Sequence, residues 1–314
     1  MIFKLIYGNH AANGLAIVDT LMLIKHGLEE LGHQAHLERN ICPGHINIVT
    51  EFFTYDFLAH YEKSLDTPGT QFIIVATEYL TGETFNNFDN LKIEQFSTLN
   101  SHYDNLTYWK KRFTTFEIAA KHAVAIWHLS EHQVANYQNR FGKNKVAYLP
   151  HAYIASLEHE NTVDLKDKDV DVIFTGTATP YRMNILNGLA NKGLEVKVLE
   201  VMTPEYVRAS WVSRSKVAIN LRQHADWKYP SNSRYYYHLM NHSMLVSEKC
   251  EFDCDLSNYV AEVEADSFID YVIDLIKSHT YQARAIENLG RFKLERPMKP
   301  LMAPLVMDIT NNKC

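Results

Sequence analysis

Two loops in the second half of the chain carry arginines that could bind an anion. Gly176 follows an apolar run, and Thr179 and Pro180 then mark the start of a helix whose first turn holds Arg182. Main-chain amides at a helix N-terminus bind phosphate oxygens, and so does a neighbouring guanidinium group. We therefore predict a diphosphate site that includes Gly176, Thr177 and Arg182.

A second segment of this kind lies between residues 215 and 247. Arg222 follows a predicted strand and Arg234 opens the next predicted helix, so both should lie at the sheet edge where ligands bind. Hydroxyl and amide groups between them can bind sugar or phosphate oxygens, and an aromatic ring can stack on a base or a sugar. The donor-binding residues predicted in this segment are Arg222, Tyr229, Ser231, Asn232, Ser233 and Arg234.

Two residues in the first half are candidates for a catalytic base. His10 lies in the loop 8–14, which has glycine at both ends, and Glu78 follows the predicted strand 72–76. An imidazole or a carboxylate placed there can take a proton from an acceptor hydroxyl. Glu51, after the predicted strand 46–49, is a weaker third candidate. Each of the three also has a structural interpretation, as a group that is hydrogen-bonded within its loop.

Alternating strands and helices must position these residues in both halves. The apolar pattern predicts strands over residues 2–7, 34–38, 46–49, 72–76, 124–127, 146–149, 171–174, 195–200, 216–221 and 244–247. It predicts helices over residues 15–31, 180–192, 232–241 and 281–296, the last followed by an irregular tail with three prolines. Further helix starts are indicated by a capping box at Ser130 and Gln133, by Thr203 with Pro204, and by Asp266. Such alternation builds parallel sheets.

The chain length and one polar stretch indicate two domains. The 314 residues exceed the roughly 100–200 of a typical domain, and residues 158–169 are polar without apolar periodicity. We predict the α/β class, with two Rossmann-like domains facing across a cleft. The first covers residues 1–155 and the second residues 156–280, and the helix and tail over 281–314 could return to the first domain.

Composition narrows the classes of function. The net charge of −6 gives no basic footprint, and the basic residues 110–112 are expected to form a solvated helix face, so no nucleic-acid partner is predicted. The apolar start is too short for a signal peptide, and no window is long enough to span a membrane. Only Cys250 and Cys254 of the four cysteines are close in sequence, so no metal site is predicted. A reduced, cytoplasmic protein is expected.

Four segments resemble glycosyltransferases of the two-Rossmann (GT-B) type, particularly the bacterial spore-maturation-type family-1 transferases. They are residues 15–37, 125–151, 172–198 and 216–247, of which the last is the most specific. The resemblance implies a sugar-nucleotide donor in the second domain, an acceptor in the first, no obligatory metal and no further cofactor. Residues 234–238 lack the acidic residue that such families often carry in this helix, and residues 241–243 lack their glycine.

These patterns favour a glycosyltransferase. Arginines and helix N-termini would stabilise the diphosphate leaving group, and the unidentified acceptor would be a glycan, a lipid-linked glycan, a protein or a small molecule. A sugar-nucleotide epimerase or hydrolase is an alternative, which His10, His128, His132 and His151 could serve. A non-catalytic module that binds a sugar nucleotide is the other.

Overall fold

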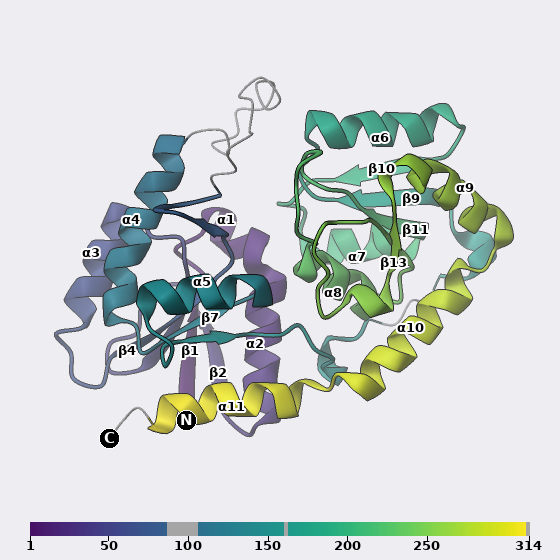
Figure 1. Cartoon of the computed structure of the whole chain (residues 1–314). Coiled ribbons are helices and arrows are strands. Elements are labelled where there is room, and N and C mark those ends of the chain that lie inside the picture. Colours follow the sequence, from purple (N-terminus) through teal and green to yellow (C-terminus); the bar gives the residue numbers. More distant parts are fainter. Residues whose placement is uncertain (87–105, 160–162, 312–314) are drawn as a thin grey trace. The chain divides into compact units, whose positions relative to one another are not determined.

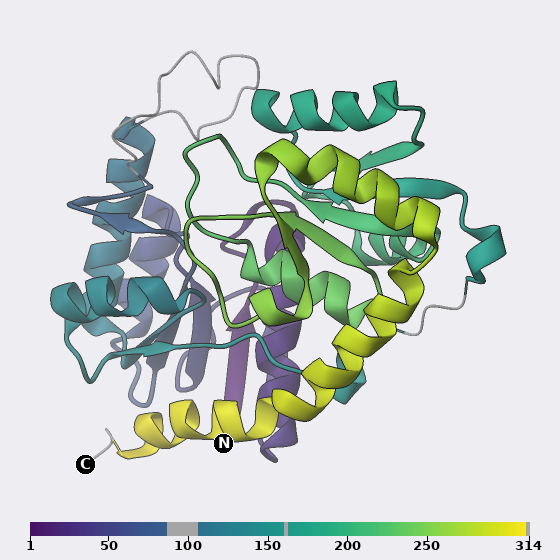
Figure 2. The ribbon, with the colours of Figure 1, turned by 45° about the vertical axis from the view of Figure 1, so that its right-hand side comes forward.

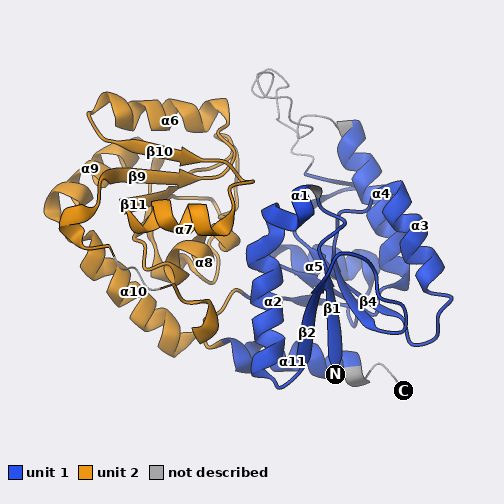
Figure 3. Ribbon diagram, turned by 180° about the vertical axis from the view of Figure 1, so that it is seen from behind, with its two compact units in different colours: residues 1–150, 298–314 blue, residues 151–297 orange. Residues whose placement is uncertain are grey.

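The computed structural model describes residues 1–86, 106–159 and 163–311. The chain forms two compact units: unit 1 is Met1–Pro150 with Met298–Cys314, and unit 2 is His151–Pro297 (Figure 3). The division falls at residue 150, where the sequence placed it at 155. The segment 281–314, predicted as one piece, is itself divided, because its first helix belongs to the second unit and its remainder to the first.

Unit 1 contains a six-stranded parallel sheet in the order β2-β1-β3-β4-β7-β8 (Figure 1). The strands are β1 (Ile2–Ile6), β2 (Gln34–Glu38), β3 (Ile46–Thr50), β4 (Gln71–Ala76), β7 (Ala125–His128) and β8 (Val146–Tyr148). A short hairpin of β5 (Leu80–Thr81) and β6 (Thr84–Phe85) follows β4. Every predicted strand of this half is present, with its ends within one residue of the prediction. The strand order reverses beside β1, as in a Rossmann-like domain.

Helices pack on both faces of this sheet. They are α1 (Ala11–Gly14), α2 (Val18–Glu30), α3 (Tyr55–Ser64), α4 (Leu106–His122), α5 (Glu131–Phe141) and α11 (Met298–Asn311). Aromatic side chains of α3, α4 and α5 bury one face of the sheet, among them Tyr61, Phe116 and Tyr137. The predicted capping box before α5 is wrong, because Ser130 makes no side-chain cap and the Gln133 side chain accepts instead from the amide of Leu80, at 2.8 Å.

The C-terminal segment is the helix α11 rather than the predicted irregular tail. One of its prolines lies in the first turn, where the missing N–H has no partner to lose, and Pro304 removes one hydrogen bond. Buried Met298 and Met302 pack against Gly27 of α2, where a Cβ atom would come within 3.1 Å of Met298. The apolar packing on α2 therefore outweighs the unfavourable proline.

Unit 2 contains a five-stranded parallel sheet in the order β10-β9-β11-β12-β13. The strands are β9 (Val170–Thr175), β10 (Val196–Leu199), β11 (Ser215–Asn220), β12 (Leu245–Glu248) and β13 (Ala261–Val263), of which β13 was not predicted. The helices are α6 (Pro180–Asn191), α7 (Glu205–Ser213), α8 (Asn232–Met240), α9 (Phe268–Ser278) and α10 (Tyr281–Glu295). The α6 and α9 helices share one apolar core with the sheet (Figure 2).

The helix starts of unit 2 test the capping signals directly. Thr179 caps α6 as predicted, accepting from the amide of Arg182 at 3.3 Å, with proline in the first turn. The other two starts are displaced by one residue, since Pro204 and Ser267 occupy the cap positions of α7 and α9. Among the described residues, no helix has the length and apolar character needed to cross a membrane.

We expect Met302→Ala to lower the free energy of unfolding of unit 1 by about 2–5 kcal/mol, because it leaves a cavity between α11 and α2. Met302 is wholly buried, whereas Met307 on the same helix is 58% exposed. Met307→Ala is therefore the matched control and should change stability by at most about 0.5 kcal/mol. Urea unfolding of both variants gives the comparison, and equal effects would mean that α11 does not pack as described.

Candidate functional site

Two arginines lie against the same aromatic ring at the end of β9. The guanidinium carbons of Arg182 and Arg234 are each 5.4 Å from the centre of the Phe174 ring. Within the described parts of the chain, neither arginine forms an ion pair with a carboxylate. Burial, together with the charge of Arg234, lowers the pKa of Arg182 to about 9, and burial lowers that of Arg234 to about 10. The nearby carboxylate of Glu248, which pairs with Arg222, offsets part of the charge of Arg182, but the two arginines have no ion pair of their own within the described residues.

Carbonyl oxygens at the strand ends hold both guanidinium groups in place. Arg182 donates from Nη2 to the carbonyl of Leu221 at 2.9 Å and from Nη1 to that of Thr177 at 2.8 Å. Arg234 donates from Nε to the carbonyl of Thr175 at 2.7 Å, and from Nη1 to the side-chain oxygen of an asparagine in β11. Neutral acceptors orient the guanidinium groups and leave their charge available to a ligand.

Gly176 provides the space for Arg234. Its φ is +147°, and a Cβ atom there would lie 2.6 Å from Nη2 of Arg234, so a side chain at this position would displace the guanidinium group. The amide of Gly176 itself donates to the carbonyl of Leu199 at 2.8 Å and is not available to an anion, contrary to our expectation. The next two amides, of Thr177 and Ala178, make no hydrogen bond to any described residue.

Arg222 differs from these two arginines because its charge is already balanced. Its Nη2 lies 2.6 Å from the carboxylate of Glu248, a wholly buried residue at the end of β12, which also accepts from the Arg222 amide at 3.0 Å. The Tyr181 hydroxyl accepts from Nη2 at 3.1 Å. Arg222 therefore orders its loop by an internal ion pair. The sequence analysis did not identify Glu248, although an acidic residue directly after a predicted strand was a signal that could have indicated it.

The remaining predicted donor residues lie in the loop before α8 and in its first turn. The Tyr229 ring stacks on that of Phe252, with 5.0 Å between the ring centres. Ser231 occupies the cap position of α8 without a side-chain cap, and Asn232 follows it. The Ser233 hydroxyl lies 3.3 Å from Nε2 of His151. Arg234 is the member of this group whose contacts with the residues around Gly176 are established, through the carbonyl of Thr175.

Unit 1 has a second cluster of charges, at the ends of β3 and β4. Arg112 of α4 is 9% exposed and lies between two carboxylates, so its prediction as part of a solvated face is wrong. Its Nη1 lies 3.0 Å from Glu78 and its Nη2 lies 3.5 Å from Glu51. Burial opposes the charge of Arg112, yet the two carboxylates raise its pKa above the ordinary value. Sequence reasoning did not find this pairing, because the partners are far apart along the chain.

The two carboxylates of this cluster differ in exposure. The Glu51 side chain is 2% exposed and accepts from the amide and the hydroxyl of Thr77. Burial and the charge of Glu78 raise the pKa of Glu51 to about 7. The Glu78 side chain is 20% exposed and accepts from the Asn86 amide group at 2.6 Å. Of the two, Glu78 is the carboxylate that a substrate can reach.

His10 lies just before α1, with its ring 5.3 Å from that of Phe52. Burial and the nearby charge of Arg112 lower the pKa of His10 to about 4, so the ring is neutral near pH 7. Its Nε2 atom is buried and has no hydrogen-bond partner among the described residues. A pKa of about 4 and a buried Nε2 atom make this ring a weak base near pH 7, so the structure favours Glu78 over His10 for the predicted role.

Three further histidines belong to the epimerase alternative. His128 is wholly buried, with Nε2 3.1 Å from the carbonyl of Glu78 and Nδ1 accepting from the amide of Ser130 at 2.9 Å. His132 is exposed on α5, and His151 is buried in unit 2. No group of three or more histidine, cysteine or acidic residues in residues 1–86, 106–159 and 163–311 is arranged to hold a metal ion.

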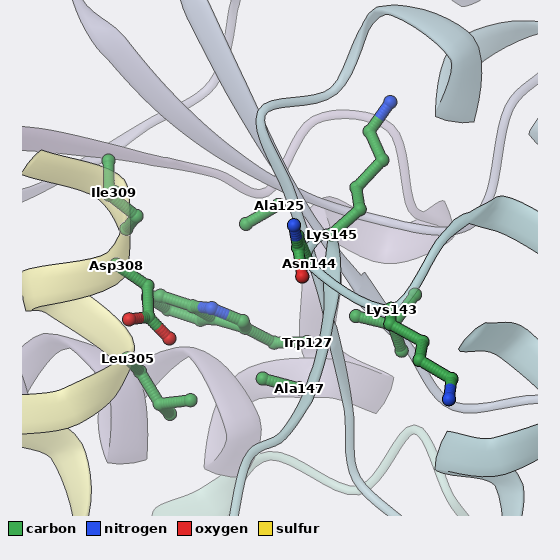
Figure 4. A pocket seen from close by; sticks show the side chains of 10 residues that line it. Ala125, Trp127, Lys143, Asn144, Lys145, Ala147, Leu305, Asp308 and Ile309 are labelled. Carbon is green, nitrogen blue, oxygen red and sulfur yellow. The ribbon is translucent and has the colours of Figure 1, made fainter. Parts of the chain in front are cut away.

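A cavity of about 270 Å³ lies elsewhere in unit 1, between the start of β7, the residues before β8, and α11 (Figure 4). Both apolar side chains, such as Trp127 and Leu305, and polar residues, such as Asn144, line it, with the carboxylate of Asp308 beside the indole ring. It contains none of the candidate residues. Parallel α/β sheets bind ligands at the carboxyl ends of their strands. This cavity lies at the opposite edge, where β7 and β8 begin, so it is not a candidate for the predicted chemistry.

Comparison with known proteins identifies the fold. The sequence matches no protein-family profile and no curated protein. The structure matches AviGT4, a glycosyltransferase involved in avilamycin A biosynthesis, with a TM-score of 0.54, 10% identity, and coverage of 99% of this chain and 97% of that one. It matches TarM with a TM-score of 0.53, 9% identity, and coverage of 92% and 58%. The chain has the GT-B fold.

The GT-B fold confirms the predicted class of two Rossmann-like domains. The N-terminal domain of Candida albicans trehalose-6-phosphate phosphatase shares it, with a TM-score of 0.53, 9% identity, and coverage of 100% of this chain and 97% of that one. The chain spans only 58% of the length of TarM. At these identities the likeness establishes the fold, and the finer resemblance to spore-maturation-type transferases stays a prediction.

We expect the rings of His10, His128 and His238 to remain neutral at pH 5, because burial lowers their pKa values to about 4, 4 and 3. In the unfolded chain histidine takes up a proton near pH 6.5, so these residues reduce stability as the pH falls from about 7 towards 4. Ring ¹⁵N shifts recorded between pH 8 and 5 measure this, with the urea-unfolded protein as the control. If the rings in the folded protein become half-protonated above pH 6, that result would contradict their burial.

Proposed function

We propose that the protein is a glycosyltransferase that moves a sugar from a nucleoside-diphosphate sugar to an acceptor hydroxyl, without a metal ion. The observation that carries this proposal is the pair Arg182 and Arg234, two guanidinium groups on one phenylalanine ring without a carboxylate partner in the described residues. A buried charge without a counter-charge is unfavourable unless a ligand supplies one. A diphosphate is an anion of suitable charge.

The chemistry of sugar transfer explains why such a pair would be retained. When the bond between the anomeric carbon and the diphosphate oxygen breaks, negative charge accumulates on the diphosphate. Fixed guanidinium groups stabilise that charge without reorganising during the reaction. GT-B neighbours give further support, since one matched structure is that of S. aureus TarM with UDP, at a TM-score of 0.51 and 12% identity.

Unit 1 would supply the acceptor side of the reaction. Glu78 is partly exposed and hydrogen-bonded, and His10 is neutral, so each could take the acceptor proton. We favour Glu78, because its carboxylate is the more accessible group. The acceptor could be a glycan, a lipid-linked glycan, a protein or a small molecule.

A panel of sugar nucleotides tests the proposal against its two alternatives. The protein is incubated with each sugar nucleotide, with and without candidate acceptors, in buffer containing EDTA. Nucleotide release that depends on an acceptor supports the transferase. An isomerised sugar indicates an epimerase, acceptor-independent release a hydrolase, and protection against thermal unfolding without turnover a binding module.

We expect Arg234→Ala to weaken nucleoside-diphosphate binding by about 1.5–3 kcal/mol, the cost of a lost hydrogen bond to a charged group. Arg214→Ala is the matched control, because Arg214 is exposed and already paired with Asp169. Calorimetric titration of both variants measures the difference. If Arg234→Ala lowers thermal stability but leaves the affinity for the nucleoside diphosphate unchanged, Arg234 is a structural residue. That result would contradict the proposed diphosphate site.

If the enzyme inverts, we expect Glu78→Gln to reduce turnover by about 100-fold or more while leaving donor affinity nearly unchanged, because only the proton transfer is lost. His10→Ala is tested in parallel, with turnover and donor affinity measured for each. Should both variants keep full turnover, neither residue is the base, and a retaining mechanism or another residue has to be considered.

A further inference from the structure

The main chain of Glu78 is fixed by side chains from three other parts of unit 1. Its amide donates to the carboxylate of Glu51, after β3, at 3.2 Å. Its carbonyl accepts from the Tyr137 hydroxyl of α5 at 2.9 Å and lies 3.1 Å from Nε2 of His128, the last residue of β7. The three partners are buried, at 2%, 0% and 0% exposure.

The carboxylate of Glu78 is fixed as well. Arg112 contacts Oε1 at 3.0 Å, and the Asn86 amide group donates to Oε2 at 2.6 Å. Asn86 has a positive φ of 50° and accepts from the amide of Tyr79 at 3.0 Å, which closes the turn around Glu78. Both carboxylate oxygens and both main-chain polar groups of Glu78 therefore have side-chain partners.

Such support exceeds what a loop residue needs for stability. Arg112 places a charge in a largely buried region, and Glu51, whose pKa lies at about 7, places a further partial charge there; both cost free energy that apolar residues would not. A catalytic carboxylate gains from this arrangement, because reaction rates fall steeply when the reacting group is displaced by about an ångström. Contacts from buried side chains that do not themselves touch the substrate hold a reactive side chain in one orientation.

We propose that Glu51, Tyr137 and Arg112 are positioning residues that hold Glu78 ready to accept the proton of the acceptor hydroxyl. The proposal rests on the role of Glu78 as the base. In the step itself, the acceptor O–H bond breaks and its proton passes to the Glu78 carboxylate. The oxygen forms the new bond to the anomeric carbon, and the electron pair of the breaking C–O bond leaves with the diphosphate.

Two tyrosines of unit 1 provide a matched test. Tyr137 and Tyr61 are both wholly buried, and each donates its hydroxyl to a main-chain carbonyl, at 2.9 Å to Glu78 and at 2.8 Å to Ala119. Tyr137→Phe and Tyr61→Phe each remove one hydrogen bond from a buried hydroxyl to a main-chain carbonyl, so they should lower thermal stability to a similar extent. Positioning predicts that only Tyr137→Phe lowers kcat, by about 10-fold, with the KM for the sugar nucleotide unchanged.

Glu51→Gln provides an independent variant that keeps the shape of the side chain. Its amide oxygen can still accept from main-chain amides, but its charge beside Arg112 is lost, so kcat should fall while the donor KM stays constant. Equal kcat values for Tyr137→Phe and Tyr61→Phe, or an unchanged kcat in Glu51→Gln, would overturn the positioning role. Full turnover in Glu78→Gln would instead refute Glu78 as the base, which distinguishes the two failures.

Discussion

Arg182 and Arg234 carry positive charge that no ion pair within the described residues balances, and the surrounding structure is arranged to hold it. Strand ends supply carbonyl oxygens to both guanidinium groups, each group lies 5.4 Å from the centre of the Phe174 ring, and Gly176 leaves room for Nη2 of Arg234. This arrangement lowers stability in the absence of an anion, since burial depresses both pKa values. Binding sites commonly retain such unfavourable local features.

Charge balance distinguishes the two arginines that we propose bind the diphosphate from the arginines that support the structure around them. Arg222 is neutralised by the buried Glu248 and orders a loop. Arg112 is shared between two carboxylates, one of which is partly exposed, and so it orients Glu78 rather than attracting an anion. The neighbouring acidic groups thus distinguish the roles that we propose for these arginines.

The sequence predicts the parts of the fold that local physics determines. Strand ends were placed within one residue because buried parallel strands are continuous apolar runs. Of the cap signals, only the threonine before Pro180 gave the correct cap, and the others were wrong or displaced by one residue. The partners of Arg112 and Arg222 could not be predicted, since they come from distant strand ends. The helix α11 was missed because its prolines oppose a helix locally, and only its packing on α2 compensates for them.

Titration of the whole chain with nucleoside diphosphates tests the central claim most directly. The diphosphates of uridine, thymidine, adenosine and guanosine would each be compared with the nucleoside alone by calorimetry in the presence of EDTA. An unbalanced arginine pair predicts that at least one diphosphate binds saturably and its nucleoside at least about 10-fold more weakly, since each charged hydrogen bond contributes roughly 1.5–3 kcal/mol. Equal affinities for a diphosphate and its nucleoside, or no binding of any diphosphate, would contradict the claim.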